Sequence, residues 1–311
     1  MNMEKVEQAF GLLTANIEVI QRELNTDFYD AFVEQNANFL GAMTVENLTV
    51  LSKNNDQLRA LNLTKIEWQK LFQFVLLKGS QVAPLQPNHA LTPDSIGLLF
   101  EFIIEQLFPK NELRLIEFGS GTGNLAETLL VNTVKNIDYL GFEVDDLLLD
   151  LSASMSEIIG TKATFIQQDA VQARVLEPAD VLISDLPIGF YPDDALAAHF
   201  EVANPDGHTY AHHLLIEQGF KYLKDNGVAL FLAPEELLNS AQAPFLKKWL
   251  PQHARLSAVI TLPESLFKAE NKAIFVLEKS SAEHPTFVYP LTSLTDRESL
   301  QNFMTEFKKS F

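Results

Sequence analysis

The sequence predicts an α/β protein in which a doubly wound, mostly parallel sheet follows a helical N-terminal domain. Three observations support this fold class. Residues 1–80 carry apolar side chains at three- and four-residue steps, as amphipathic helices do. From about residue 92, short apolar runs alternate with helical stretches, which is the pattern of a parallel sheet with helices on both faces. A glycine-rich loop follows the first of these runs directly, where sheets of this kind bind ligands.

Composition sets the class of protein. The chain has 311 residues, 47% of them hydrophobic, and no cysteine, so disulfides, thiolate nucleophiles and cysteine-bound metals are excluded. The N-terminus lacks a basic region followed by an apolar core, and no apolar run approaches the roughly 18 residues of a membrane span. We therefore expect a cytoplasmic protein without membrane contact. The net charge of −18 argues against tight binding of nucleic acid by the chain alone.

The helical domain is predicted to span residues 1–80. Its clearest periodic segments are 6–24 and 64–80, and the second ends in Lys-Gly-Ser, which indicates a helix stop. Residues 81–93 contain three prolines and are predicted to be a linker. We expect an accessory role for this domain, in dimerisation, substrate contact or capping, and assign residues 81–311 to the catalytic domain.

Seven strands are predicted in the catalytic domain. They are expected at 113–118, 138–144, 163–168, 180–185, 227–233, 256–262 and 272–279. Beyond them, residues 287–294 could add a strand and residues 296–311 a helix.

The glycine loop runs from Gly119 to Gly123, with glycine at every second position. Glycine permits a tight turn and lets a ligand approach the backbone closely. The dinucleotide fingerprint needs a later glycine where this chain has Asn124, and no Gly-Lys-Ser/Thr of a phosphate-binding P-loop follows. A turn without a ligand is the alternative interpretation.

An acid, one residue and then G-x-G-x-G resemble the first motif of class I S-adenosylmethionine (SAM)-dependent methyltransferases. The resemblance implies a Rossmann-like sheet whose last strand is antiparallel, and SAM as the cofactor. It also implies that the loop contacts the amino-acid end of SAM, that Glu117 orders the site, and that acids after the second and third strands contact the ribose and adenine. The cofactor-binding residues expected in this way are Glu117, Gly119, Gly121, Gly123, Asn124, Glu143, Val144, Asp169, Ala170 and Asp185.

The loop after the fourth predicted strand resembles the acceptor motif of amino-methylating enzymes, which is Asn, Asp or Ser followed by Pro-Pro and an aromatic residue. Here the sequence is Asp185-Leu186-Pro187-Ile188. Asp185 and the Leu186 carbonyl are expected to accept the hydrogens of an amine. Because leucine and isoleucine replace the first proline and the aromatic residue, Phe190 or Tyr191 is expected to take the stacking role. A proline-stiffened structural loop is the alternative.

Two further stretches narrow the family. Residues 89–103 resemble the Thr-Pro segment before the glycine loop in gamma-class N6-adenine DNA methyltransferases and type I restriction–modification methylase subunits, which implies that Thr92 and Pro93 contact the cofactor. Residues 212–238 and 256–279 resemble the fifth to seventh strands of the same enzymes. In size and in the Asp-Leu-Pro loop the chain is most similar to the small bacterial YtxK-type proteins.

The leading hypothesis is a SAM-dependent N-methyltransferase of the adenine-N6 type that acts on DNA or another nucleic acid. The alternatives are a SAM-binding or partner-binding protein that has lost transferase activity, and a methyltransferase for another amine. Because the chain is acidic, nucleic acid, with DNA favoured over RNA, is expected to bind weakly to it alone. The partners expected are a second copy, through the N-terminal helices, or a separate specificity partner. No metal site is expected, since His212 and His213 are adjacent on a predicted helix and point about 100° apart.

Overall fold

The computed structural model describes residues 1–42, 49–83, 85, 91–267, 270–280 and 284–311. By their internal contacts these residues form two compact units. The first contains Met1–Asp94, Ser120–Thr133 and Glu143–Gln167, and the second contains Ser95–Gly119, Val134–Phe142 and Gln168–Phe311. Six of the thirteen residues of the predicted linker, residues 84 and 86–90, lie outside the described part of the chain.

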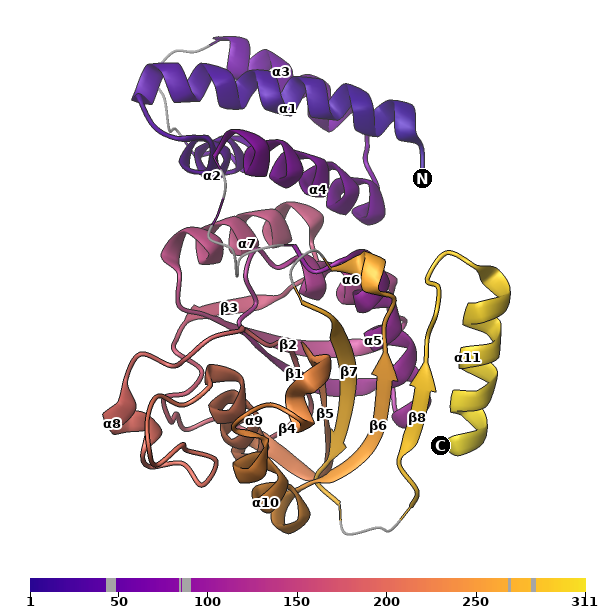
Figure 1. Ribbon diagram of the computed structural model, residues 1–311. Coiled ribbons are helices and arrows are strands. Elements are labelled where there is room, and N and C mark those ends of the chain that lie inside the picture. Colours follow the sequence, from indigo (N-terminus) through magenta and orange to yellow (C-terminus); the bar gives the residue numbers. More distant parts are fainter. Residues whose placement is uncertain (43–48, 84, 86–90, 268–269, 281–283) are drawn as a thin grey trace. The chain divides into compact units, whose positions relative to one another are not determined.

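The first unit packs the N-terminal helices against helices of the glycine-loop region. In Figure 1, α1, α2, α3 and α4 lie over α7. Contacts join α2 and α4 to α7, and α4 to α6. The elements of this unit are α1 (Met3–Leu24), α2 (Phe28–Phe39), α3 (Thr49–Ala60), α4 (Lys65–Val82), α6 (Asn124–Asn132), α7 (Asp146–Ile159) and β3 (Thr164–Gln167). The predicted helical character of residues 1–80 is therefore confirmed where the chain is described.

Side-chain caps fix where these helices begin. Asn2 and Asp27 accept backbone N–H groups at the starts of α1 and α2, which would otherwise lack partners. Thr64 and Glu67 form a reciprocal capping box at α4. Glu67 also accepts the backbone N–H of Asn2 at 2.6 Å and so ties the start of α1 to α4.

The predicted helix stop at residues 78–80 is wrong, because α4 continues to Val82. Gly79 is a packing residue within the helix. A Cβ atom at this position would lie 2.8 Å from ring atoms of Phe28 and Tyr29. Any larger side chain would push α2 away, so glycine here permits the close approach of two helices.

One mixed sheet runs through the chain, and within the described residues it has eight strands in the order β3-β2-β1-β4-β5-β7-β6-β8. The remaining strands are β1 (Glu112–Phe118), β2 (Asn136–Glu143), β4 (Ala179–Asp185), β5 (Leu223–Pro234), β6 (Arg255–Thr261), β7 (Lys272–Glu278) and β8 (Phe287–Pro290). All seven predicted strands are present, and β7 is antiparallel to β5 and β6, as expected. β7 is not the last strand, because β8 follows it and pairs in parallel with β6. The sheet therefore has eight strands in the described residues, one more than the seven predicted.

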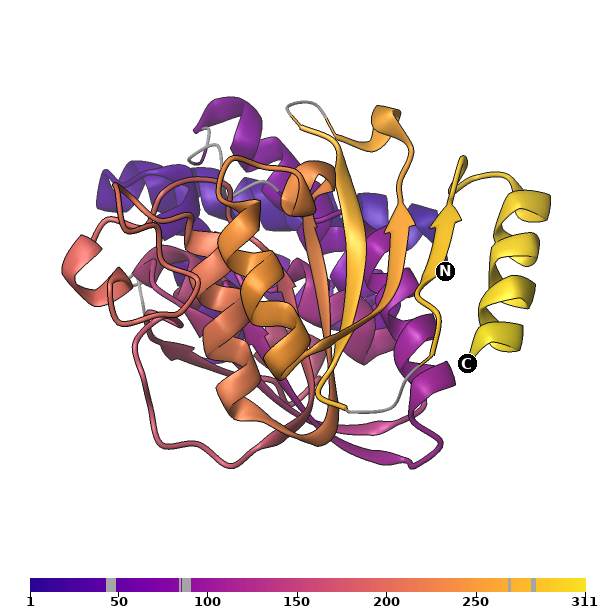
Figure 2. The ribbon, with the colours of Figure 1, turned by 60° about the horizontal axis from the view of Figure 1, so that its bottom comes forward.

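Helices of the second unit cover its strands. Figure 2 shows the C-terminal helix α11 (Arg297–Ser310) beside β8, where Phe303 and Phe307 pack edge-on against Phe102 of α5. The other helices of this unit are α5 (Asp94–Leu107), α8 (Asp194–Ala197), α9 (Ala211–Tyr222) and α10 (Ala243–His253), with short 3₁₀ turns at Glu235–Leu238 and Glu264–Leu266. In the described part of the chain, no helix is both long and apolar enough to cross a membrane.

Candidate functional site

The glycine loop has the left-handed backbone that its glycines predict. Gly119, Gly121 and Gly123 have φ angles of 67°, 55° and 77°. A Cβ atom on Gly119 or Gly121 would meet no protein atom within 4 Å, whereas one on Gly123 would lie 3.0 Å from Cβ of Ser152. Gly123 is therefore required by packing within the first unit. Gly119 and Gly121 leave space above the backbone, which fits a loop that a ligand approaches.

Glu143, at the end of β2, holds the glycine loop in place. Its Oε2 accepts the Gly121 N–H at 2.7 Å, and its Oε1 accepts the N–H groups of Val144 and Asp145 at 2.8 and 3.0 Å. The carboxylate is buried, and Val144 next to it is exposed. Because carboxylate oxygens each have two lone pairs, these bonds leave Glu143 able to accept a further donor such as a ribose hydroxyl.

Two predicted cofactor residues are joined beside the loop. Asn124, the first residue of α6, donates its Nδ2 to the Thr92 carbonyl at 2.6 Å. Pro93 follows Thr92 and is half-buried. The Thr-Pro segment thus lies against the start of the helix that the glycine loop opens, within the first unit.

In the second unit, Glu117 is buried on β1. Its Oε2 accepts the hydroxyl of Tyr139 on β2 at 2.6 Å. Glu117 is paired in register with Gly141 on the same neighbouring strand. A buried acid needs such partners, because an unpaired charge in the interior is costly. The role of Glu117 in ordering the site, which the resemblance implies, stays a prediction.

Asp169 follows β3 and is held by three donors. Its Oδ1 accepts the Val171 N–H at 2.9 Å, and its Oδ2 accepts Gln172 Nε2 at 3.3 Å and the Tyr191 hydroxyl at 2.5 Å. Burial and the bond to Asp169 raise the pKa of the Tyr191 hydroxyl, which keeps it a donor. Ala170 is buried beside this cluster. Tyr191 thus links the loop after β3 to the loop after β4.

Asp185 lies at the carboxyl end of β4 and forms an ion pair with Lys272, the first residue of β7. Both side chains are mostly buried. The next residue, Leu186, is buried and donates its N–H to the Leu232 carbonyl of β5 at 2.9 Å. The acceptor loop therefore begins on a fixed strand end, with one carboxylate oxygen already bound to an ammonium group.

Aromatic rings support the rest of the acceptor loop. Phe190 stacks on Tyr210 with ring centroids 5.1 Å apart, and Tyr210 stacks on His212 at 5.0 Å, with interplanar angles of 10° and 16°. Phe190 is 57% exposed, whereas Tyr191 is only 8% exposed. Of the two aromatic residues expected to stack on an acceptor, Phe190 therefore has the accessible face.

His213 also belongs to this aromatic group. It is fully buried, and its ring stands edge-on to Tyr210 and His212. Burial lowers the pKa of His212 to about 4, and burial together with the neighbouring His212 lowers the pKa of His213 to about 3. Both rings are therefore neutral near pH 7 and act as packing groups.

These histidines predict sensitivity to acid. Because their folded-state pKa values lie below the usual 6.5, the unfolded chain binds more protons, and their contribution to stability is lost as the pH falls below 6.5. We expect His213 alone to cost about 2 kcal/mol of stability between pH 7.5 and pH 5. Thermal unfolding of wild type and His213→Phe at both pH values measures this difference.

Glu127 also titrates within this pH range, so the stability of wild type must be compared with that of His213→Phe. Burial raises the pKa of Glu127 to about 7, so its contribution changes in the opposite direction over the same pH range. Glu127 is common to both proteins, so the difference between them isolates His213. An equal loss of stability in His213→Phe and wild type would contradict the assignment.

Several partners of these residues were not predicted from sequence. Tyr139 bonds to Glu117 and Lys272 pairs with Asp185, while Tyr210 supports Phe190. Lys272 had one usable signal. An antiparallel seventh strand begins at the edge where β4 ends, so its first residue must lie near Asp185.

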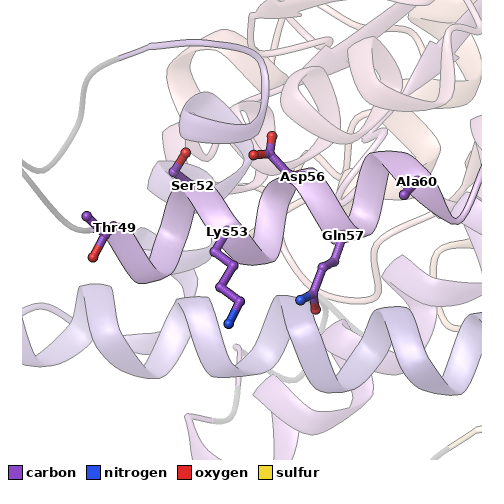
Figure 3. A pocket seen from close by; sticks show the side chains of 6 residues that line it. All are labelled: Thr49, Ser52, Lys53, Asp56, Gln57 and Ala60. Carbon is purple, nitrogen blue, oxygen red and sulfur yellow. The ribbon is translucent and has the colours of Figure 1, made fainter.

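A hollow of about 460 Å³ lies elsewhere, along α3 (Figure 3). Its lining residues are Thr49, Ser52, Lys53, Asp56, Gln57 and Ala60. It contains none of the residues that the sequence predicts for cofactor or acceptor binding. Asp56 in its wall is paired with Arg59 on the same helix, at 3.1 Å, which is typical of a solvated helix face.

Comparisons with known proteins identify the family. No family model matches the chain. The uncharacterized protein YtxK of Bacillus subtilis (strain 168) is 30% identical over 326 residues, which cover 100% of this chain and 99% of the relative. The chain belongs to the YtxK family. The predicted resemblance is therefore confirmed.

Solved structures confirm the fold of this YtxK-family protein. A candidate class I SAM-dependent methyltransferase from Listeria monocytogenes is 30% identical, with a TM-score of 0.89 over 100% of both chains. The methyltransferase subunit of a type I restriction–modification system from Streptococcus thermophilus has a TM-score of 0.64 at 13% identity, over 96% of this chain and 74% of that one. The protein has the fold of class I SAM-dependent methyltransferases.

Proposed function

We propose that this YtxK-family protein binds SAM and transfers its methyl group to an amine, with N6 of adenine in DNA or another nucleic acid as the leading acceptor. One observation carries the proposal of SAM binding: the glycine loop leaves space at Gly121, while the Glu143 carboxylate fixes the loop by accepting the Gly121 N–H. At Gly123 of the same loop, by contrast, a Cβ atom would lie 3.0 Å from Cβ of Ser152.

The residues present fit SAM. This cofactor supplies a methyl group on a positively charged sulfur. Glu143, in the first unit, has a lone pair left for a ribose hydroxyl, and Thr92, Pro93 and Asn124 border the loop there. In the second unit, Asp169 is held ready as an acceptor by Tyr191. This donor and acceptor set contains no cluster of cations, which suits a cofactor that lacks phosphates.

The β4 loop supports an amine as the acceptor. Asp185 and the Leu186 carbonyl can accept the two hydrogens of an amine and hold its lone pair in one direction. The exposed face of Phe190 can stack on a planar ring that carries this amine. Methyl transfer of this kind depends mainly on positioning, which can lower a barrier by several kcal/mol. After transfer the nitrogen must lose one proton, and the Asp185 carboxylate is a nearby acceptor.

A second candidate is a SAM-binding protein without transferase activity. The ion pair between Asp185 and Lys272 favours it, because the ammonium occupies an oxygen that an amine acceptor would use. A radiolabelled methyl-transfer screen over DNA, tRNA, rRNA and protein fractions distinguishes the two. Label in a nucleic-acid fraction supports the leading proposal, label in protein identifies another amine, and SAM binding without any transfer supports the second candidate.

Charge predicts weak binding of duplex DNA by this chain alone. Acidic residues number 41 against 23 lysines and arginines, so the general basic excess that releases counterions from DNA is missing. We expect weak DNA binding near 0.15 M salt, and rescue by a second polypeptide if DNA is the substrate. A salt titration of DNA binding checks this. Submicromolar affinity with a steep salt slope would instead reveal a local basic patch, since charges beyond about 8 Å are screened.

A further inference from the structure

Helix α4 contacts the predicted cofactor residues through Gln73. The side chain is buried, and its amide is fully engaged. Nε2 donates to Asp94 Oδ1 at 2.5 Å and to Asn124 Oδ1 at 2.9 Å, while Oε1 accepts Lys70 Nζ at 3.1 Å. An amide group supplies two donors and one acceptor in this geometry, which neither a carboxylate nor an apolar side chain can do.

Asn124 links Gln73 to the Thr-Pro segment through two hydrogen bonds. Because its Oδ1 accepts Gln73, its Nδ2 must point the other way, where it donates to the Thr92 carbonyl at 2.6 Å. One chain of hydrogen bonds therefore joins α4, the first residue of α6 and the segment before α5. All of these residues belong to the first unit.

A second contact ties the same two helices together one turn earlier on α4. Gln69 Nε2 donates to Thr128 Oγ1 at 2.6 Å, and that hydroxyl donates to the Asn124 carbonyl at 2.8 Å. Gln69 and Gln73 are both buried on α4. Gln69 contacts the body of α6, whereas only Gln73 of the two bonds to the Asn124 side chain. A substitution at Gln69 therefore changes the packing of α4 on α6, whereas a substitution at Gln73 also removes a hydrogen bond to the Asn124 side chain.

We infer that the N-terminal helices are part of the cofactor-binding unit, and that Gln73 is a positioning residue that holds Asn124 and Thr92 in the arrangement that binds SAM. The inference rests on the proposed SAM binding. Its consequence is coupling. A ligand that requires this arrangement stabilises the packing of α4 on α6, and loss of that packing weakens binding of the ligand by the same factor.

The test compares SAM affinity in wild type and three variants by calorimetry. Gln73→Met keeps the size of the side chain and removes its hydrogen bonds, and we expect its Kd for SAM to rise about tenfold, the scale of one ordered hydrogen bond. Gln69→Met makes the same change in the same interface, and we expect its Kd to stay within about twofold while its Tm falls. Gln57→Met, on the exposed face of α3, should change neither quantity.

Hydrogen exchange distinguishes a positioning role of Gln73 from a purely structural one. SAM should slow exchange of the α4 amides around Gln73 in wild type and in Gln69→Met, and this protection should be lost in Gln73→Met. Wild-type affinity and protection in a folded Gln73→Met protein would overturn the inference and leave the proposed function intact. Failure of wild type to bind SAM would overturn the proposed function, and the inference with it.

Discussion

Replacement of Gly121 by valine is expected to abolish SAM binding while the protein still folds. A Cβ atom at this position meets no protein atom within 4 Å, so the added side chain does not collide with the fold. It would fill the space that the bare backbone leaves for the cofactor. The positive φ of 55° adds strain of about 1–2 kcal/mol, which a protein of ordinary stability tolerates.

Gly160→Val is the matched control for strain. Gly160 has a φ of 76°, ends α7 in the same unit, and also has open space at its Cβ position. Both variants should lose similar stability, but only Gly121→Val should lose SAM binding. Calorimetry and thermal unfolding of both proteins measure the two effects. Unaltered SAM affinity in a folded Gly121→Val protein would reject the assigned pocket.

The second large effect is expected at Asp185. We predict that Asp185→Ala removes methyl transfer while SAM affinity stays within a few-fold, because this carboxylate is assigned to the acceptor amine. The measurement is methyl transfer to the acceptor found in the screen, together with SAM binding by calorimetry. A variant that transfers methyl at the normal rate would contradict the assignment.

Lys272 complicates the Asp185 variant and therefore belongs in the experiment. Loss of one partner of a mostly buried ion pair leaves an uncompensated charge, at a cost of about 3–5 kcal/mol. The double variant Asp185→Ala with Lys272→Met removes both charges and should recover stability without recovering transfer. Asp185→Asn keeps an oxygen that accepts an amine hydrogen, so it should retain part of the activity. Equal activity in the alanine and asparagine variants would contradict a role for this oxygen.

Most of the fold could be predicted from the sequence because its signals are local. Each apolar run bounded by polar residues formed a strand, and the run at residues 287–294 supplied β8, which also fixes α11 beside it. The end of α4 could not be predicted in this way. Gly79 resembles a helix stop locally, but its role depends on Phe28 and Tyr29, which lie about fifty residues away in sequence.

In the candidate site, too, local features could be predicted from the sequence, whereas contacts between distant residues could not. Glycines and strand-end acids are recognisable because their spacing follows the strands, and the resemblance to methyltransferase motifs then implies roles for Gly121, Glu143 and Asp185. Their partners carry no such spacing. Gln73 lies on a helix whose register against α6 is set by packing, so its bonds could be seen only in three dimensions. For Lys272, the antiparallel seventh strand indicated only the edge of the sheet at which it lies. The predicted contacts of these residues with SAM and acceptor remain predictions, as does a separate helical domain at residues 1–80.

A calorimetric titration of the 311-residue chain with SAM, in the presence of a metal chelator, tests the proposed SAM binding most directly. We expect saturable binding of one SAM per chain that needs no metal, since the glycine loop, Glu143 and Asn124 of one chain are assigned to one proposed site. Absence of binding by the folded protein, or binding that appears only when metal is restored, would contradict it.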